Sequence, residues 1–167
     1  KCIVGLLKSD GGTIRVFGEN VNELNSDRMS EMRKKVGFLF QSGALYDSMT
    51  VRENLEFPLR RIKKDLSEKE ISEKVIKALE NVGLADALNK MPSQLSGGMR
   101  KRISLARTIV VDPMIMLYDE PTTGLDPVTS DEISELINEV QKKYKTSSII
   151  ITHDIECARA TADRIIM

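Results

Sequence analysis

The sequence has 167 residues, 41% of them hydrophobic, which is enough for one ordinary core and excludes a compositionally disordered chain. Its 25 lysines and arginines balance its 25 aspartates and glutamates, so no overall charge favours nucleic acid, and we expect no nucleic-acid partner. Cys2 and Cys157 lie far apart without CxxC or Cys/His spacing, which fits ordinary packing better than a disulfide or metal site. No apolar run approaches the ~18 residues of a membrane span.

The first part of the sequence predicts short alternating elements. Residues 1–7 have the pattern of the last turns of a helix, and because the pattern is already under way at Lys1, we expect the sequence to be a fragment. Residues 13–17 alternate and are β-branched, which predicts a strand ending at Gly18. A short polar helix is expected at 27–35, followed by an apolar, buried strand at 36–40.

The middle of the sequence predicts helices and no convincing strand. Thr50 and Glu53 have capping-box spacing, as do Ser67 and Glu70, so a helix is expected to begin at each pair. Gly83 follows the second helix where a left-handed residue belongs. On either side of this block the pattern alternates strands and helices, which indicates a helical subdomain inserted into an α/β core.

The last part of the sequence returns to the α/β pattern. Asp126 and Pro127 provide the N-cap and first position of a helix. Residues 147–152 predict a buried strand that delivers His153 to the sheet edge where open α/β sheets bind ligands. A short helix is expected at 156–161, and a last strand is expected to begin at 163–167.

We therefore expect one α/β domain over 1–167, truncated at both ends, with a mostly parallel sheet. Residues 1–49 and 112–167 would form its core, and 50–111 the inserted helical subdomain.

Residues 95–127 carry most of the chemistry. Ser96, Gly97 and Gly98 open a predicted helix, and two glycines with unpaired N–H groups behind them can bind an anion, although a plain loop before an amphipathic helix is the simpler interpretation of an isolated SGG. An apolar strand then ends in Asp119 and Glu120, whose buried charges need compensation by a cation or hydrogen bonds. Strand alternation would point these two side chains in opposite directions, one toward Mg²⁺ and one toward an attacking water.

Two further candidates have simpler interpretations. Asp126 is adequately explained as a helix N-cap. His153 is the single histidine, and a lone histidine is more often structural, but beside paired acids at a ligand-binding edge it is a candidate contact for a γ-phosphate.

Together these residues resemble the nucleotide-binding domain of an ABC (ATP-binding cassette) ATPase, with a P-loop NTPase (RecA-like) core. The family's motifs occur in order: the glutamine loop at Gln41, the signature at 95–99, Walker B at 115–120, the D-loop at 124–126 and the switch histidine at His153. The resemblance covers essentially the whole sequence.

The resemblance assigns roles in ATP hydrolysis. Asp119 resembles the acid that holds Mg²⁺, and Glu120 the general base that polarises the hydrolytic water. Gln41 is similar to the residue that contacts Mg²⁺ or that water and transmits its presence to a transport partner. His153 resembles the γ-phosphate sensor.

Other roles implied by the resemblance lie between subunits. Ser96, Gly97 and Gly98 are similar to residues that bind the γ-phosphate of ATP held by the opposite subunit of a head-to-tail homodimer, and Asp126 to a residue that organises that interface. An integral-membrane permease would dock near the Gln41 loop and the helical subdomain. The implied location is cytoplasmic, peripheral on the inner face of the cell membrane.

The sequence departs from the family in one motif. It contains no Walker A P-loop, GxxxxGK[ST], and Gly11 and Gly12 are no substitute, because neither Lys nor Ser/Thr follows in the required place. In the family the P-loop opens the helix whose tail residues 1–7 resemble, so we expect it upstream of Lys1. Taken literally, this sequence would hydrolyse ATP poorly or not at all, which leaves an inactive pseudo-ATPase as an alternative.

A finer resemblance concerns cargo. Residues 38–59, together with LSGGMRKR at 95–102, resemble the ATPase of MCE-associated lipid transporters, of the lipid-asymmetry-maintenance type, and Met99 in place of the common Gln suits this branch. The implied function is to power the movement of phospholipid or another lipid. A non-transport ABC protein of the ribosome-associated type stays open, whereas a chromosome-maintenance protein would need a long coiled coil between Gln41 and Leu95.

Overall fold

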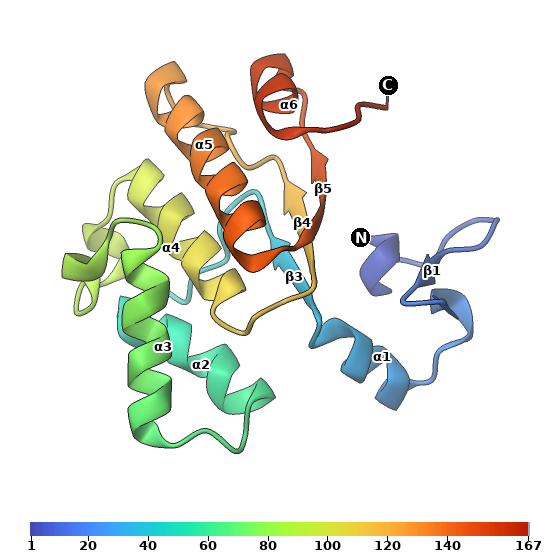
Figure 1. The fold of residues 1–167 in the computed structure, drawn as a ribbon, viewed down its shortest axis with the longest axis horizontal. Coiled ribbons are helices and arrows are strands. Elements are labelled where there is room, and N and C mark those ends of the chain that lie inside the picture. The colour runs from blue at the N-terminus through green and yellow to red at the C-terminus, as the bar shows by residue number, and fades with distance from the viewer. Residues whose placement is uncertain (167) are drawn as a thin grey trace.

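The computed structural model describes residues 1–166, which form an α/β fold around a three-stranded parallel sheet (Figure 1). The strands are β3 (Val36–Leu39), β4 (Ile115–Asp119) and β5 (Ser147–Ile151), in that order across the sheet. Their register pairs the last residue of β4 with the last of β5, Asp119 with Ile151. Since the strands are parallel, their carboxyl ends meet at one edge, and the predicted parallel α/β sheet is confirmed.

Five α-helices follow β3 along the described part of the chain. Between β3 and β4 the chain forms α2 (Val51–Ile62), α3 (Glu68–Glu80) and α4 (Gly97–Ile109), and α5 (Pro127–Tyr144) and α6 (Ile155–Thr161) flank β5 along the chain. Figure 1 shows α4 between α3 and α5, in contact with both. The helix that begins at Gly97, within the Ser-Gly-Gly sequence, is therefore the central helix of the molecule.

One hydrophobic core joins the helices to the sheet. The core residues of α4 are almost fully buried, because they recur at helical spacing and α4 has neighbours on more than one side. They pack with residues of α2, α3, α5 and the sheet, among them Leu55, Leu79, Ile103, Leu105, Ile109, Met116, Tyr118 and Ile137. Residues 50–111 thus share a continuous core with the sheet, and their independence as a subdomain stays a prediction.

Both predicted capping boxes are confirmed. The Thr50 hydroxyl accepts a hydrogen bond from the Glu53 N–H at 3.3 Å, and the Glu53 carboxylate accepts one from the Thr50 N–H at 2.7 Å. Ser67 and Glu70 repeat the pattern at the start of α3, with distances of 3.3 and 2.8 Å. Each box satisfies donors that a helix start leaves unpaired. Gly83 follows α3 with φ +70°, the left-handed conformation expected there.

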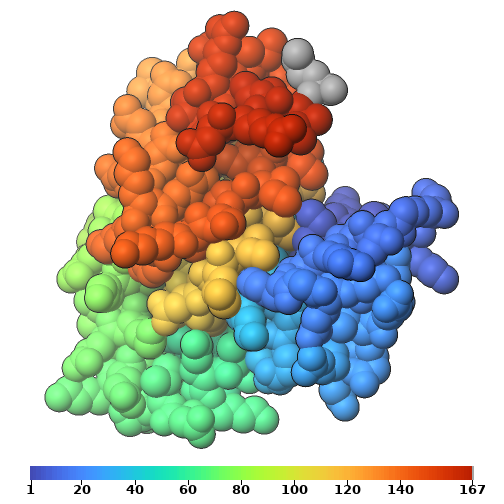
Figure 2. All heavy atoms as spheres, turned by 45° about the vertical axis from the view of Figure 1, so that its right-hand side comes forward, coloured from blue at the N-terminus to red at the C-terminus, as the bar shows by residue number. Residues whose placement is uncertain are grey.

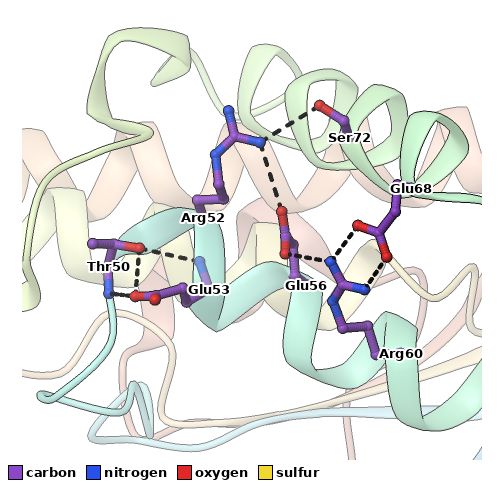
Figure 3. Close-up of polar contacts among 7 residues, drawn as sticks. All are labelled: Thr50, Arg52, Glu53, Glu56, Arg60, Glu68 and Ser72. Atoms are coloured by element: carbon purple, nitrogen blue, oxygen red, sulfur yellow. Dashed lines mark hydrogen bonds and ion pairs between the residues drawn. The ribbon is translucent and has the colours of Figure 1, made fainter.

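Polar side chains tie α2 to α3 on the solvent side (Figure 3). Arg60 bonds to Glu56 of its own helix at 3.0 Å and to both carboxylate oxygens of Glu68 at 2.5 and 2.6 Å. Arg52 lies 3.6 Å from Glu56 and 3.5 Å from the Ser72 hydroxyl. Because Arg60 and Glu68 are exposed, the ion pair between the two helices adds little to stability.

The N-terminal residues fold differently from the prediction. Instead of the last turns of an α-helix, residues 1–7 contain one 3-10 turn, Cys2–Val4, which ends at Gly5 with φ +63°. The predicted strand at 13–17 is cut short, because Phe17 and Gly18 both take positive φ and form a tight turn. The chain reverses there into a two-stranded hairpin.

This hairpin consists of β1 (Arg15–Val16) and β2 (Glu19–Asn20), joined to a turn at Val21–Glu23 and to α1 (Ser26–Arg33). Helix α1 confirms the predicted polar helix. Figure 2 shows these N-terminal segments as a lobe at the side of the molecule, away from the helices that follow β3. Further 3-10 turns lie at Ala85–Ala87 and Pro92–Gln94.

Two predictions near the C-terminus are wrong. Strand β5 is not buried: Ile149 and Ile151 are 47% and 58% exposed, because β5 is an edge strand and one face of it carries no covering element among residues 1–166. The predicted last strand is not formed at 163–166, and Met167 lies outside the described residues. Within the described part of the chain, no helix combines the length and apolarity needed to cross a membrane.

Candidate functional site

The carboxyl edge of the parallel sheet brings together residues that are far apart in the sequence. Gln41 follows β3, Asp119 is the last residue of β4 with Glu120 directly after it, and His153 follows β5. This is the edge at which open α/β sheets bind ligands. The structure therefore places the four predicted residues Gln41, Asp119, Glu120 and His153 at one end of the sheet.

Gln41 and Asp119 line the same hollow. The sheet-edge hollow has a volume of about 470 Å³ and is lined by Lys1, Phe40, Gln41, Ser42, Asp119 and Thr123. No three His, Cys, Asp or Glu side chains in residues 1–166 gather closely enough to hold a metal alone. One carboxylate and one amide oxygen nevertheless fit Mg²⁺, which keeps several waters and takes further ligands from phosphates.

Glu120 has an unusual backbone conformation. Strand β4 ends at Asp119, and Glu120 takes φ +52°, which non-glycine residues seldom adopt. Its N–H donates to the Ile151 carbonyl of β5 at 2.8 Å, which holds this conformation in place. We predicted that strand alternation would point Asp119 and Glu120 in opposite directions. That reason is wrong, because Glu120 lies beyond the end of β4. The two acids still have different surroundings.

The Glu120 carboxylate is held by three donors. Its Oε2 accepts hydrogen bonds from His153 Nδ1 at 2.8 Å, from the Thr123 hydroxyl at 3.1 Å and from the Thr152 hydroxyl at 3.4 Å. The side chain is 19% exposed. Partial burial alone would raise the pKa of this carboxyl, but the hydrogen bonds from His153 and Thr123 outweigh it and lower the pKa below its ordinary value. Glu120 is therefore ionised at neutral pH.

The contact with Glu120 also changes the pKa and the orientation of His153. Its hydrogen bond to Glu120 and the negative charge of that carboxylate raise the pKa of the imidazole. The ring is 77% exposed, so Nδ1 faces Glu120 while the rest of the ring faces solvent. An imidazole held in this way can present Nε2–H to an anion at the sheet edge.

The Ser-Gly-Gly sequence lies in a second hollow. The signature hollow, of about 360 Å³, is lined by Ser96, Gly97, Gly98, Met99, Arg102, Gly124, Leu125, Asp126, Thr129 and Glu132. The structure thus brings Asp126 beside Ser96, Gly97 and Gly98, in a different hollow from Gln41 and Asp119. Thr123 lines the sheet-edge hollow and the next residue, Gly124, lines the signature hollow, so the two hollows meet at this turn.

Close packing explains why glycine stands at the start of α4. A Cβ on Gly98 would lie 2.7 Å from Cγ2 of Thr129, so the start of α4 approaches the start of α5 more closely than a side chain permits. Ser96 is the N-cap of α4, and its hydroxyl oxygen accepts the Met99 N–H at 3.2 Å. The hydroxyl proton stays available for a ligand, as does the positive end of the helix.

Asp126 caps α5. Its carboxylate accepts the Thr129 N–H at 3.1 Å and the Thr129 hydroxyl at 2.6 Å, and these hydrogen bonds lower its pKa. The N-cap interpretation of Asp126 is confirmed, while a role between subunits stays a prediction.

Sequence reasoning missed three side chains at the sheet edge. The hydroxyls of Thr123 and Thr152, which bond to Glu120, carry no pattern that predicts this contact. Lys101 is 7% exposed and donates hydrogen bonds to the backbone carbonyls of two predicted residues, Gln41 and Glu120. A signal for Lys101 exists: it precedes Ser104 by three residues and Leu105 by four, which places it on the buried stripe of α4.

A parallel sheet whose carboxyl edge presents two adjacent acids, beside helix starts suited to anions, is typical of α/β proteins that bind phosphate groups. The comparisons with known proteins give the family. A model described as "ABC transporter" matches residues 1–123, and the chain belongs to the ABC transporter family.

The chain is similar to named ATP-binding proteins. It is 41% identical to the "Probable ribonucleotide transport ATP-binding protein mkl" of Mycobacterium leprae, covering 98% of this chain and 47% of that protein. It is 40% identical to the "Intermembrane phospholipid transport system ATP-binding protein MlaF" of Haemophilus influenzae, covering 98% and 61%. The chain thus spans about half the length of the curated relatives it matches.

Solved structures agree with the fold. The ATP-binding cassette MJ0796, solved as a dimer in a post-hydrolysis state with ADP and Pi, is 31% identical and superposes with a TM-score of 0.84, over 96% of this chain and 70% of that one. The predicted ABC-type fold with a P-loop NTPase core is therefore confirmed.

Proposed function

We propose that this chain belongs to a subunit that hydrolyses ATP and thereby powers an ABC transporter. The observation that carries the proposal is the Glu120 carboxylate, which is ionised, held by three donors and placed next to the sheet-edge hollow. A carboxylate fixed in this way can orient a water molecule and accept its proton. The ADP and Pi bound to the related cassette support a phosphate chemistry.

In this proposal Asp119 and Gln41 would hold Mg²⁺ together with the phosphates of ATP, because both line the sheet-edge hollow. The metal, when bound, would neutralise charge on the transferred phosphoryl group. The chain's own contribution is mainly to position groups: Glu120 directs the water, and the exposed side of His153 can donate to a γ-phosphate oxygen. The raised pKa of His153 favours the form that donates from both ring nitrogens.

The signature hollow would serve a different ATP molecule. Gly97 and Gly98 lie in a hollow separate from that of Asp119, so one nucleotide bound at the sheet edge of this chain need not contact both. We infer that Ser96, Gly97 and Gly98 contact ATP held by a second copy, arranged head to tail about a two-fold axis, with Asp126 at that interface. The dimeric state of the related cassette supports this arrangement.

For cargo, we propose a phospholipid or another lipid. The similarity to MlaF and the Met99 variant of the signature support this choice, whereas the mkl relative is named for ribonucleotide transport. The partner would be an integral-membrane permease that docks near the Gln41 loop and the helices of residues 50–111. The subunit would then sit in the cytoplasm, peripheral on the inner face of the membrane.

Substitution of the proposed base tests the hydrolytic function. In the full-length protein, Glu120→Gln should retain ATP binding, lower turnover by about 100-fold or more and trap a dimer, because the amide cannot accept the proton of water. Glu135→Gln, at an exposed position of α5, is the matched control and should turn over ATP normally. Unchanged turnover in Glu120→Gln would remove Glu120 from this role.

Transport itself distinguishes the cargo. The full-length protein, assembled with its permease in phospholipid vesicles, should move a fluorescent phospholipid in an ATP-dependent way, and the Glu120→Gln assembly should not. ATP-dependent movement of a ribonucleotide, with no movement of lipid, would contradict the lipid proposal while leaving the ATPase intact.

A further inference from the structure

Lys101 is the one charged side chain among the buried polar residues in the part of the chain that the structure describes. It lies in the second turn of α4 and is 7% exposed. Its ammonium group donates to the Gln41 carbonyl at 2.5 Å and to the Glu120 carbonyl at 3.2 Å. A single side chain of the central helix thus joins the segment after β3 to the segment after β4.

The surroundings of Lys101 account for its burial. Burial lowers the pKa of the ammonium group, and the negative charges of Glu120 and Asp119 act in the opposite direction. A buried charge is costly unless it is paired and hydrogen-bonded. The Lys101 ammonium group has both kinds of compensation: the Gln41 and Glu120 carbonyls accept its hydrogen bonds, and the two acids supply negative charge. An apolar side chain of similar length would fill the same space but leave two backbone carbonyls without this donor.

Two further contacts hold the same loop against α4. Ser104 lies one turn after Lys101, and a Cβ on Gly43 would come within 2.5 Å of its hydroxyl oxygen. Gly43 has φ +79°, so both its conformation and its close approach require glycine. Arg107, one turn further on, donates to the Ala44 carbonyl at 2.6 Å. Consecutive turns of α4 therefore contact successive points of the loop from Gln41 to Ala44.

We propose that Lys101 is a positioning residue that fixes the Gln41 loop relative to Glu120, so that both side chains address the same nucleotide. The inference rests on the proposed ATPase function, in which Gln41 and Glu120 act together. Of the three loop contacts, the one from Lys101 alone also reaches Glu120. Since α4 begins at Gly97 in the signature hollow, the same helix connects that hollow to this pair of carbonyls.

Lys101→Met tests the proposal in the full-length protein, with Lys142→Met on the exposed side of α5 as the matched control. Loss of the two hydrogen bonds should lower kcat about 10-fold to 100-fold, because small displacements of catalytic groups are costly, while the Kd for ATP changes less than about 2-fold. Lys101→Gln, which keeps a donor of shorter reach, should recover part of the lost kcat. A purely structural role would instead lower the folded fraction, measured by urea unfolding, and leave kcat per folded molecule unchanged.

Amide hydrogen exchange provides a second measurement that needs no ATP. In Lys101→Met, exchange should become faster both at residues 41–44 and at 120–123, and stay unchanged across α3. Normal kcat, or faster exchange at only one of the two segments, would overturn the proposal. If the unsubstituted protein does not hydrolyse ATP, the proposed function fails, and the exchange result alone decides whether Lys101 links the two segments.

Discussion

The two hollows of this protein are built in different ways. At the sheet edge, the Glu120 carboxylate is held by Thr123, Thr152 and His153, so its position depends on the pairing of β4 with β5. In the signature hollow, Ser96 and Asp126 bond to the first turns of their own helices. Beside the first hollow, a carboxylate is thus fixed by one local and two long-range contacts, whereas the second hollow is formed at a pair of helix starts.

This difference suits different tasks. A fixed carboxylate such as that of Glu120 can orient a water, because several contacts define its position. Helix starts instead offer backbone N–H groups and a partial positive charge to an anion that arrives from outside. The contrast favours an arrangement in which a chain activates its own nucleotide at the sheet edge and contacts that of a partner through the signature hollow.

The largest expected effect concerns the approach of α4 to α5. Gly98→Ala would place a methyl group against Cγ2 of Thr129 and should lower ATP turnover by about 100-fold, since it shifts the signature hollow. Adding Thr129→Ser removes the opposing methyl group and should restore the free energy of unfolding. Turnover should stay low if phosphate must approach the backbone at Gly98. Full recovery of turnover in the double variant would show that Gly98 serves packing alone.

Two N-cap serines provide a smaller effect with an internal control. Ser96→Ala and Ser67→Ala each remove the cap of a 13-residue helix and should each lower the free energy of unfolding by about 1 kcal/mol. Turnover should fall only in Ser96→Ala, about 10-fold, because the Ser96 hydroxyl also faces the signature hollow. Equal turnover in the two variants would assign Ser96 to capping alone. Urea unfolding and steady-state hydrolysis measure the two quantities.

The smallest expected effect is the pH dependence of the Glu120–His153 pair. The raised pKa of His153 means that its contribution to stability is present below the ordinary value of 6.5 and is lost as the pH rises through the raised value. The lowered pKa of Glu120 means that its contribution is present above 4.5 and is lost as the pH falls through the lowered value. The exposed imidazole keeps both effects small.

The single histidine of the sequence makes the pair directly measurable by NMR. In Glu120→Gln the pKa of His153 should fall toward its ordinary value, and the decrease of Tm with rising pH across this range should become shallower. An identical titration midpoint in both proteins would contradict the ion pair.

Features that depend on local sequence, such as helix starts, could be predicted, whereas features that depend on long-range contacts could not. The starts of α2, α3 and α5 were predictable, because Thr50, Ser67 and Asp126 satisfy N–H groups three residues away. The parallel strands and the shared edge of Asp119 and His153 followed from hydrophobic pattern and strand order. Local chemistry and periodicity were sufficient for these features.

The remaining features depend on packing that no local pattern encodes. The left-handed conformation of Glu120 is held by a hydrogen bond to Ile151, and the burial of Lys101 by carbonyls 60 and 19 residues away in sequence. The exposure of β5 depends on its edge position, and a short apolar run cannot distinguish an edge strand from a central one. The hairpin was missed because Phe17, an apolar residue typical of strands, takes the turn conformation.

Mixed dimers test the central claim most directly, namely that the sheet-edge hollow and the signature hollow of one chain serve two different ATP molecules. In the first dimer, one full-length chain carries Glu120→Gln and the other Gly98→Ala. In the second, one chain carries both substitutions and the other carries neither. The two dimers contain the same substitutions and differ only in their distribution.

The first dimer should retain about half of the turnover of the unsubstituted dimer, because both substitutions fall on one ATP site and the other site stays intact. The second dimer should be almost inactive, because each of its sites receives one substitution. Turnover in the second dimer but not in the first, or equal turnover in the two, would contradict the division of the two hollows between two nucleotides.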